Sequence, residues 1–236
     1  MQLLLIRHAE SVNNLLATQH VFAEYMRRRS PDPSITERGF VQADALARHL
    51  EKVDYGITDM FVSPMRRAVQ TARPMVQALN LKPRMWVAIH EDGGMFTGDP
   101  NAPESVSGHP GLTRAEFARD DPEFELVDEI TDDGWWTAGW EDRAACHARA
   151  IRVAADLVNR AESERAQGIR SVVALVSHGT FLDALIKALF GHLPDERHHY
   201  FLNNTALSLL DFSRPGRIRL AYLNRTEHLP ADLITV

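Results

Sequence analysis

The sequence contains little cysteine and no long hydrophobic run. Only Cys146 among its 236 residues is a cysteine, so no internal disulfide can form. A secreted scaffold held together by disulfides is therefore excluded, and a reducing compartment is favoured. The apolar run at residues 1–6 is too short for the core of a signal peptide, and no later stretch could span a bilayer. We expect a cytoplasmic protein with no membrane partner.

The sequence also lacks an excess of positive charge. Its formal net charge at pH 7 is −6, whereas proteins that bind nucleic acids usually carry a basic surplus for phosphate contacts. We therefore expect no nucleic-acid partner. With 44% hydrophobic and 25% charged residues, the chain has the composition of a globular protein, and its length fits one domain over residues 1–236.

The negative charge is concentrated in one part of the chain. Between residues 92 and 140, twelve acidic residues face only Arg114 and Arg119, which gives a net charge of −10. Three of the four tryptophans lie in the same stretch. We expect residues 92–140, here named the acidic segment, to form a cap inserted within the domain.

Outside the acidic segment, strands and helices are expected to alternate. Short apolar runs predict strands at residues 2–6, 60–63, 84–89 and 172–176, and the β-branched character of the last one predicts a central position. Capping and amphipathic spacing predict helices that open at residues 34–37, include residues 68–79, and span 141–165 and 180–190. Residues 207–212 and 218–223 read as a terminal hairpin. This order predicts a three-layer α/β/α fold with a mostly parallel central sheet.

Four of the predicted strands are followed directly by polar side chains. These are Arg7-His8, Arg66-Arg67, His90-Glu91-Asp92 and Ser177-His178. Because the carboxyl ends of parallel strands share one edge of a sheet, we expect these groups to converge there. Arginine matches phosphate oxygens in bidentate fashion, and a neutral imidazole whose pKa is lowered by nearby guanidinium groups is a nucleophile for phosphorus. A carboxylic acid can protonate the departing alcohol. The set therefore predicts phosphoryl transfer through a histidine.

The motifs around these residues resemble those of the histidine phosphatase superfamily, in its phosphoglycerate mutase-like branch of phosphatases and mutases. The resemblance covers most of the chain outside the acidic segment. It rests on residues 7–11 (Arg-His-Ala-Glu-Ser) with Asn14, residues 35–43, residues 63–72 (Ser-Pro-Met-Arg-Arg-Ala-Val-Gln-Thr-Ala), residues 176–179 and residues 204–207. Ala9 stands where the family usually has glycine, and we expect a negative φ there.

The resemblance implies a role for each matching residue. His8 would be the nucleophile that becomes phosphohistidine, and Glu91 the general acid and base, with Asp92 as the less favoured alternative. Arg7, Arg67 and His178 would bind the phosphoryl group together with Asn14. It implies a small phosphorylated substrate and neither a cofactor nor a metal ion.

The sequence favours hydrolysis. An acidic cap over the cavity would repel the bisphosphorylated intermediate of a mutase, and Trp135 and Trp136 are candidates for contacting an apolar or neutral leaving group. Mutase-type transfer and a non-catalytic protein that binds a phosphorylated ligand or a protein remain as alternatives. A metal hydrolase is disfavoured, because the adjacent His198 and His199 point in different directions. The oligomeric state is left open, with a homodimer as one alternative.

Overall fold

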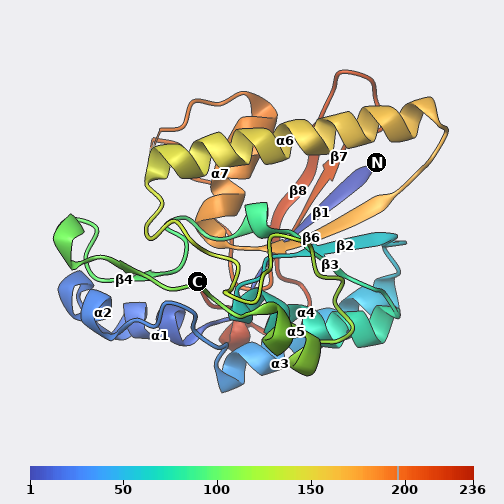
Figure 1. Cartoon of the computed structure of the whole chain (residues 1–236). Helices are drawn as coiled ribbons and strands as arrows, with labels where there is room; N and C mark the ends of the chain where they lie inside the picture. Colours follow the sequence, from blue (N-terminus) through green and yellow to red (C-terminus); the bar gives the residue numbers. More distant parts are fainter. Residues whose placement is uncertain (196) are drawn as a thin grey trace.

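A six-stranded sheet lies at the centre of the protein. The computed structural model describes residues 1–195 and 197–236. The strands are β1 (Gln2–Arg7), β2 (Asp59–Val62), β3 (Arg84–Met85), β6 (Val172–Ser177), β7 (Leu207–Asp211) and β8 (Arg219–Arg225). Their order is β3-β2-β6-β1-β7-β8 (Figure 1). The first four run parallel, whereas β7 and β8 form the expected antiparallel hairpin. The predicted mostly parallel sheet with β6 in its interior is thus confirmed.

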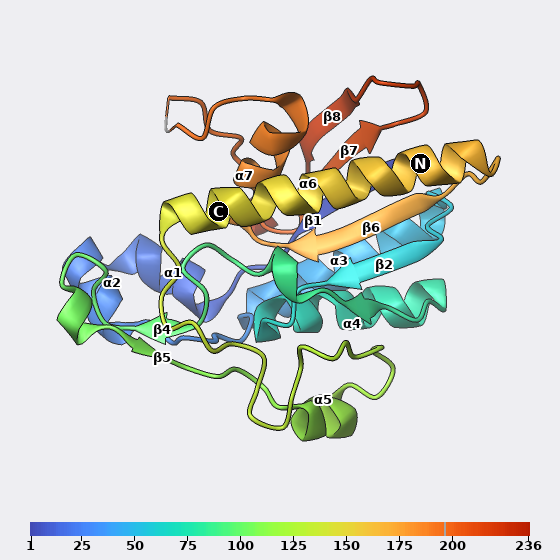
Figure 2. The ribbon, with the colours of Figure 1, turned by 45° about the horizontal axis from the view of Figure 1, so that its top comes forward.

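Helices cover both faces of this sheet (Figure 2). One face carries α6 (Arg143–Ala166) and α7 (Gly179–Phe190), and the other carries α3 (Glu37–Val53) and α4 (Arg66–Leu79). Alternate residues of β1 supply the two cores, because successive side chains of a strand point to opposite faces. Leu3 and Leu5 pack with α6 and α7, whereas Leu4 and Ile6 pack with α3 and α4. Each of these buried side chains contributes about 1.5–3 kcal/mol. The three-layer prediction is confirmed.

Two local expectations are wrong in detail. Helix α3 begins after Thr36, whose hydroxyl accepts the amide of Gly39, so the cap is two residues later than Ser34. The strand predicted at residues 84–89 ends at Met85, and residues Val87–Ile89 form a 3-10 turn. β3 pairs with the last two residues of the short strand β2 on one side and with Glu125 on the other, and the backbone turns after Met85. This turn brings the chain back toward the end of β6, where the hydroxyl of Ser177 donates to the carbonyl of Ile89.

The acidic segment packs against the domain in two places. A small hairpin of β4 (Phe96–Thr97) and β5 (Ser107–Gly108) lies beside α1 (Val12–Gln19) and α2 (Phe22–Arg28), two helices that were not expected from the sequence (Figure 2). Helix α5 (Arg114–Asp120) lies below α4 in Figure 2, and its Phe117 belongs to the same core cluster as the inner face of α4. The carboxylate of Asp121 pairs with Arg73 of α4, and that of Glu125 pairs with Arg84. Much of the acidic segment is therefore bound to the main domain.

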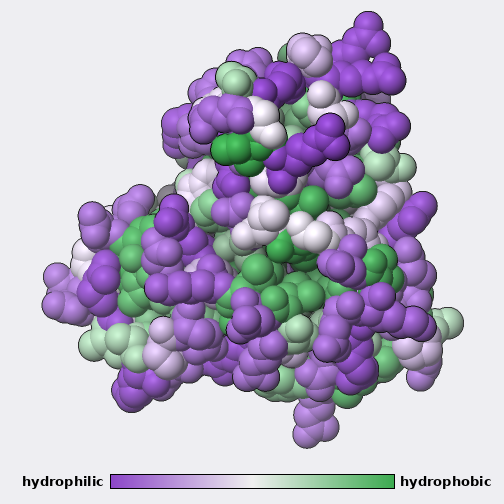
Figure 3. All heavy atoms as spheres, turned by 90° about the vertical axis from the view of Figure 1, so that its right-hand side faces the viewer, coloured by the Kyte–Doolittle hydropathy of each residue, from purple (hydrophilic) through white to green (hydrophobic). Residues whose placement is uncertain are grey.

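The surface shows both polar and apolar areas. Figure 3 views the end of the molecule at which β1, β2 and β6 start, and on this face hydrophilic residues surround a hydrophobic area. Within the described part of the chain, none of the helices combines the length and the apolar character needed to cross a lipid bilayer.

Candidate active site

A cavity of about 450 Å³ opens at the carboxyl ends of the parallel strands. Its walls include Arg7 and His8 at the end of β1, Arg67 at the start of α4, Glu91 after the turn that follows β3, and Asn14 of α1. These residues come from four separate parts of the sequence. The structure therefore brings the predicted strand-end residues to one edge of the sheet, as the topology requires.

His8 is buried, and its ring is held in a defined tautomer. Nδ1 lies 2.7 Å from the carbonyl oxygen of Ala9, which can only accept, so Nδ1 carries the proton. Nε2 therefore keeps its lone pair, which accepts a hydrogen bond of 3.2 Å from Nε of Arg67. Burial, and then the positive charges of Arg67 and Arg7, lower the pKa of His8 well below its usual value. A neutral imidazole with an unprotonated Nε2 results.

His178 lies behind His8, with the two ring centroids 5.1 Å apart. It is fully buried and does not itself line the cavity. The hydroxyl of Ser63 accepts the amide of Met65 and lies 2.8 Å from Nε2 of His178, so its own proton is available for that nitrogen. This arrangement leaves the proton of His178 on Nδ1, a buried atom with no hydrogen-bond partner among the described residues. Burial, with Arg67 and His8 next in effect, lowers the pKa of His178.

Two guanidinium groups flank the imidazoles. Arg7 donates through Nη1 to the carbonyl oxygen of Leu202, and its buried Nε has no partner among the described residues. Burial is the main cause that lowers the pKa of Arg7 to about 10. The negative charge of Glu91 raises this pKa, and the positive charge of Arg67 lowers it further. At that value Arg7 still carries its charge at neutral pH. Arg7 approaches Gly179 closely: a Cβ atom at position 179 would lie 3.2 Å from Nε, so a larger residue there would require a small shift of the Arg7 side chain. Unpaired buried donors of this kind suit an oxyanion.

Asn14 and Arg67 occupy the positions that the motifs indicate. The carboxamide oxygen of Asn14 accepts from the amide and the hydroxyl of Ser11, which leaves the amide nitrogen as the donor available to a ligand. Arg67 is buried beside His8, whereas the backbone amide of Arg66 is bound by Asp32. Arg67 lines the cavity, whereas Arg66 does not.

Glu91 and Asp92 both line the cavity, but in different surroundings. The carboxylate of Glu91 accepts the amide of Phe181 at 2.9 Å and that of Thr180 at 3.4 Å, at the start of α7. Its charge acts on the pKa values of both Arg7 and Arg67. Asp92 instead faces Arg143 at 3.7 Å, and burial raises its pKa. Glu91 is therefore the carboxylate nearer the phosphate-binding groups.

The backbone around His8 is held from behind by the loop before β7. Asn204 donates through Nδ2 to the carbonyl of His8 at 2.9 Å, and the amide of Thr205 reaches the carbonyls of Arg7 and His8. Thr205 is buried and has a φ of 57°, which is rare for a β-branched residue and is typical of strain kept at a functional site. Ala9 has the expected negative φ.

The structure also shows supporting residues to which the sequence analysis gave no role. Arg149 of α6 is buried and donates through Nη1 to the carbonyls of Ala88 and His90, directly before Glu91. Arg29, at the end of α2, lines the cavity. The position of Arg149 could have been found from helical periodicity, because it lies on the same face as the buried Cys146 and Val153.

The tryptophans differ from expectation. Trp135 and Trp136 do not line the cavity: both are buried and pack against each other and against His90. Trp136 lies directly under Gly94, where a Cβ atom would come within 2.1 Å of its ring. Large aromatic side chains are drawn into the core by their apolar area, and here they fix the acidic segment to the domain. Trp140 is the tryptophan that lines the cavity.

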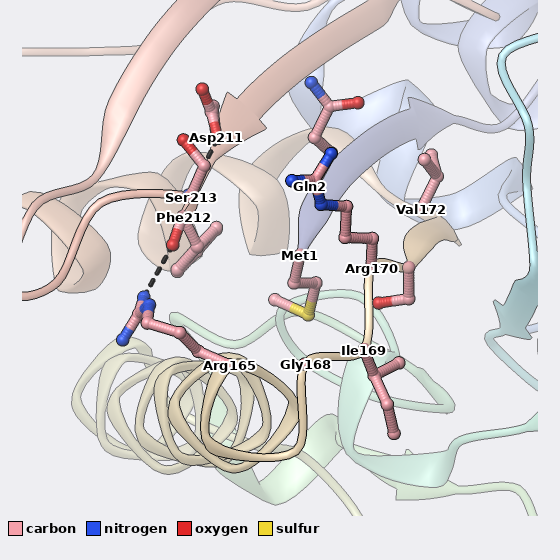
Figure 4. Close-up of a pocket in the computed structure, with 11 residues that line it drawn as sticks. Met1, Gln2, Arg165, Gly168, Ile169, Arg170, Val172, Asp211, Phe212 and Ser213 are labelled. Atoms are coloured by element: carbon pink, nitrogen blue, oxygen red, sulfur yellow. Dashed lines mark hydrogen bonds between the residues drawn. The ribbon is translucent and has the colours of Figure 1, made fainter.

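A larger cavity of about 710 Å³ lies at the opposite end of the sheet, where β1 and β6 start (Figure 4). Gln2, Arg165 and Arg170 form part of its wall, and Arg165 donates to the carbonyl of Phe212. Among the described residues that line it there is no histidine. Without an imidazole beside its arginines, this cavity lacks the chemistry of the smaller one.

The fold is of the phosphoglycerate mutase-like α/β class. The chain belongs to the histidine phosphatase superfamily (branch 1), whose family pattern matches residues 3–226. The comparison with curated proteins gives no match.

Several solved structures share this fold over nearly the whole chain. A phosphoserine phosphatase variant from Entamoeba histolytica, in complex with phosphoserine, has 22% identity and a TM-score of 0.60, with 97% of this chain and 99% of that chain covered. A mycobacterial glucosyl-3-phosphoglycerate phosphatase, in complex with VO3, has 24% identity and a TM-score of 0.59, with 95% and 99% covered. An ecdysone phosphate phosphatase from Bombyx mori, in complex with tungstate, has 17% identity and a TM-score of 0.63, with 94% and 92% covered. These similarities show the common fold.

Proposed function

We propose that the protein hydrolyses a small phosphomonoester through a phosphohistidine intermediate, without a metal ion. The observation that carries this proposal is the tautomer of His8. Its Nδ1 is committed to the carbonyl of Ala9, so the lone pair of Nε2 lies in the cavity beside Arg67. A neutral, oriented imidazole is the form of histidine that can attack phosphorus.

In the first step, Nε2 of His8 attacks the phosphorus atom and the bond to the ester oxygen breaks. Glu91, as a carboxylic acid, gives its proton to that oxygen, and the alcohol departs. The N–P bond of phosphohistidine has then formed, and the positive charges of Arg7 and Arg67 stabilise the phosphoryl oxygens. The proton on Nδ1 of His178 is available for one of them.

In the second step, water attacks the phosphorus atom and the N–P bond breaks. The carboxylate of Glu91 takes a proton from the water, and phosphate is released while His8 returns to its neutral form. The low pKa values of His8 and His178 support this cycle, because both rings keep their protonation states near neutral pH.

Mutase-type transfer is the second candidate. The charge of the acidic segment was expected to disfavour a mutase by repelling a bisphosphorylated intermediate. Only Asp92 among its acidic residues lines the cavity, so this charge does not decide between hydrolysis and mutase-type transfer. Asp121 and Glu125 pair with arginines of the main domain instead. Hydrolysis is preferred because the similar solved structures include phosphatases for phosphoserine, ecdysone phosphate and glucosyl-3-phosphoglycerate. Conversion of 3-phosphoglycerate into its 2-isomer with little phosphate release would favour the mutase.

Trapping of the intermediate tests the proposal. The protein is mixed with a ³²P-labelled phosphomonoester, quenched in alkaline denaturant to preserve the acid-labile phosphoamidate, and analysed for protein-bound label. Label is expected on the wild type and on the His198→Ala control, whose histidine is exposed at the surface. None is expected on His8→Ala. Equal labelling of His8→Ala would contradict the proposal.

A further inference from the structure

Residues 226–236, here named the rear segment, contact the loop that holds the backbone of the nucleophile from behind. The carbonyl of Thr235 accepts the amide of Asn204 at 2.9 Å. The hydroxyl of Thr205 and Nε2 of His228 are joined by a hydrogen bond of 3.0 Å. The rear segment therefore binds both of the residues that hold the backbone carbonyl of the nucleophile.

Gln42 of α3 links the rear segment to the chain just after the nucleophile. Its side chain is fully buried, and its Oε1 accepts the amide of Glu10 at 2.7 Å. A backbone amide can only donate, so this contact fixes which end of the carboxamide is the oxygen. The other end, Nε2, donates to the carbonyl of Leu233 and to the hydroxyl of Thr235, each at 2.7 Å. Both hydrogens of Nε2 are therefore in use.

The hydroxyl of Thr235 passes this direction on to Asn204. Because it accepts from Gln42, its own hydrogen is available, and it donates to Oδ1 of Asn204 at 3.0 Å. With Oδ1 occupied in this way, Nδ2 is the end of the carboxamide that faces His8 and donates to its carbonyl at 2.9 Å. Four hydrogen bonds thus run in one direction from the amide of Glu10 to the carbonyl of His8, and the bonds of such a chain strengthen one another.

The two ends of this chain hold the two peptide groups on either side of Ala9. The amide of Glu10 and the carbonyl of Ala9 belong to one planar peptide group, so the contact with Gln42 also sets the direction of that carbonyl. The carbonyl of Ala9 is the group that binds Nδ1 of His8. The other peptide group is held by Asn204 at its carbonyl and by the hydroxyl of Thr71 at its amide. The chain therefore ends at the contact that sets the tautomer of His8.

We propose that Thr235 is a positioning residue for the nucleophile. Its hydroxyl orients the carboxamide of Asn204 and, through the backbone on either side of Ala9, keeps the ring of His8 in the tautomer that leaves Nε2 unprotonated. Without this hydroxyl, Oδ1 of Asn204 loses its donor, and the carboxamide is no longer prevented from turning its oxygen toward the carbonyl of His8. The effect on rate rests on the proposed function, whereas the effect on the ring of His8 does not.

Replacing the hydroxyl by a methyl group tests the effect on rate. Thr235→Val keeps nearly the same shape but removes the donor to Asn204. With p-nitrophenyl phosphate, whose leaving group needs no proton, kcat should fall about 3- to 10-fold, the range of one neutral hydrogen bond. KM should stay within about twofold, because the guanidinium groups of Arg7 and Arg67 keep their positions.

Two further variants separate positioning from a general loss of packing. Thr235→Ser retains the hydroxyl and should restore kcat to within about twofold of the wild type. Thr226→Val makes the same chemical change elsewhere in the rear segment and should leave kcat unchanged. An unchanged kcat in Thr235→Val, equal losses in Thr235→Val and Thr235→Ser, or a loss carried by KM alone would overturn the inference.

NMR of the histidine rings gives a measure that does not require turnover. The ¹⁵N signals of His8 are identified by their absence in His8→Ala, and in the wild type they should show a protonated Nδ1 and an unprotonated Nε2. In Thr235→Val the share of this tautomer should fall, and in Thr235→Ser it should be kept. This result would support the inference even if no phosphomonoester were hydrolysed, in which case the proposed function alone would fail. Ring signals of His8 that are the same in Thr235→Val and the wild type would overturn the inference.

Discussion

Replacement of Arg149 by methionine tests how the loop that carries Glu91 is held. Arg149 is 5% exposed, and it pairs through Nε with Oε1 of Glu141 at 2.8 Å. The same guanidinium binds the carbonyls of Ala88 and His90, each at 2.9 Å. Its hydrogen bonds thus join helix α6, the chain directly before Glu91, and Glu141, the residue that follows the acidic segment.

The expected loss of stability follows from burial. Removing one partner of a buried ion pair costs about 3–5 kcal/mol, because the other charge is left uncompensated. Burial alone would raise the pKa of Glu141, but the hydrogen bonds of Arg149 and then His90 lower it to about 2. Arg149→Met removes the main cause of this lowering, and the carboxylate of Glu141 is left buried without its ion-pair partner. The second change Glu141→Gln should recover about 1–3 kcal/mol, since a neutral amide is less costly to bury than a lone charge.

Urea denaturation followed by tryptophan fluorescence measures these free energies of unfolding. Arg152→Met, an exposed change on the same helix, serves as the control and should stay within about 0.5 kcal/mol of the wild type. Activity gives a second measurement: Arg149→Met should lose more rate with alkyl phosphates, whose alcohols need a proton, than with p-nitrophenyl phosphate. A loss below about 1 kcal/mol, typical of exposed ion pairs, would refute the reasoning.

Three further predictions follow from the site. The folded protein lowers the pKa values of His8 and His178, so as the pH falls below 6.5 these histidines take up protons in the unfolded chain before they do in the folded protein. The melting temperature should therefore decrease from pH 7.5 to pH 5.5. A constant melting temperature would contradict this. Ser63→Ala removes the hydrogen bond that fixes His178 and should lower kcat about 2- to 10-fold in steady-state assays, and an unchanged kcat would exclude this positioning role. Gly94→Ala places a methyl group against the indole ring of Trp136 and should lower the free energy of unfolding by about 2–4 kcal/mol. Gly139 has a similar φ but open space around it, so Gly139→Ala should lower the free energy of unfolding by about 1–2 kcal/mol. Equal losses of stability in thermal denaturation would contradict the packing of Trp136 under Gly94.

The sequence predicted the residues that follow buried strands. His8, Arg67 and His178 follow predicted strands closely in the sequence, so local patterns were enough to find them. Their convergence at one edge of the sheet follows from the parallel topology. The turn that shortens β3 was not predictable, because the apolar run at residues 84–89 reads the same whether it pairs or turns.

The walls of the cavity were harder to predict. Arg29 lies in residues 12–33, a region for which no element was predicted, and its contact with Phe96 joins parts of the chain far apart in the sequence. The burial of Trp136 depends on the turn at Gly93 and Gly94, which both have a positive φ, because its ring lies directly under Gly94. The composition gives the net charge of the acidic segment but not which way its acidic side chains point. The structure shows that Asp121 pairs with Arg73 of α4.

A crystal structure with orthovanadate tests the central claim most directly. The vanadium atom should bond to Nε2 of His8, with its oxygens within hydrogen-bond distance of Arg7, Arg67 and Nδ1 of His178. Vanadate found instead in the larger cavity beside Arg165 and Arg170, with Nε2 of His8 still bound only by Arg67, would contradict the account.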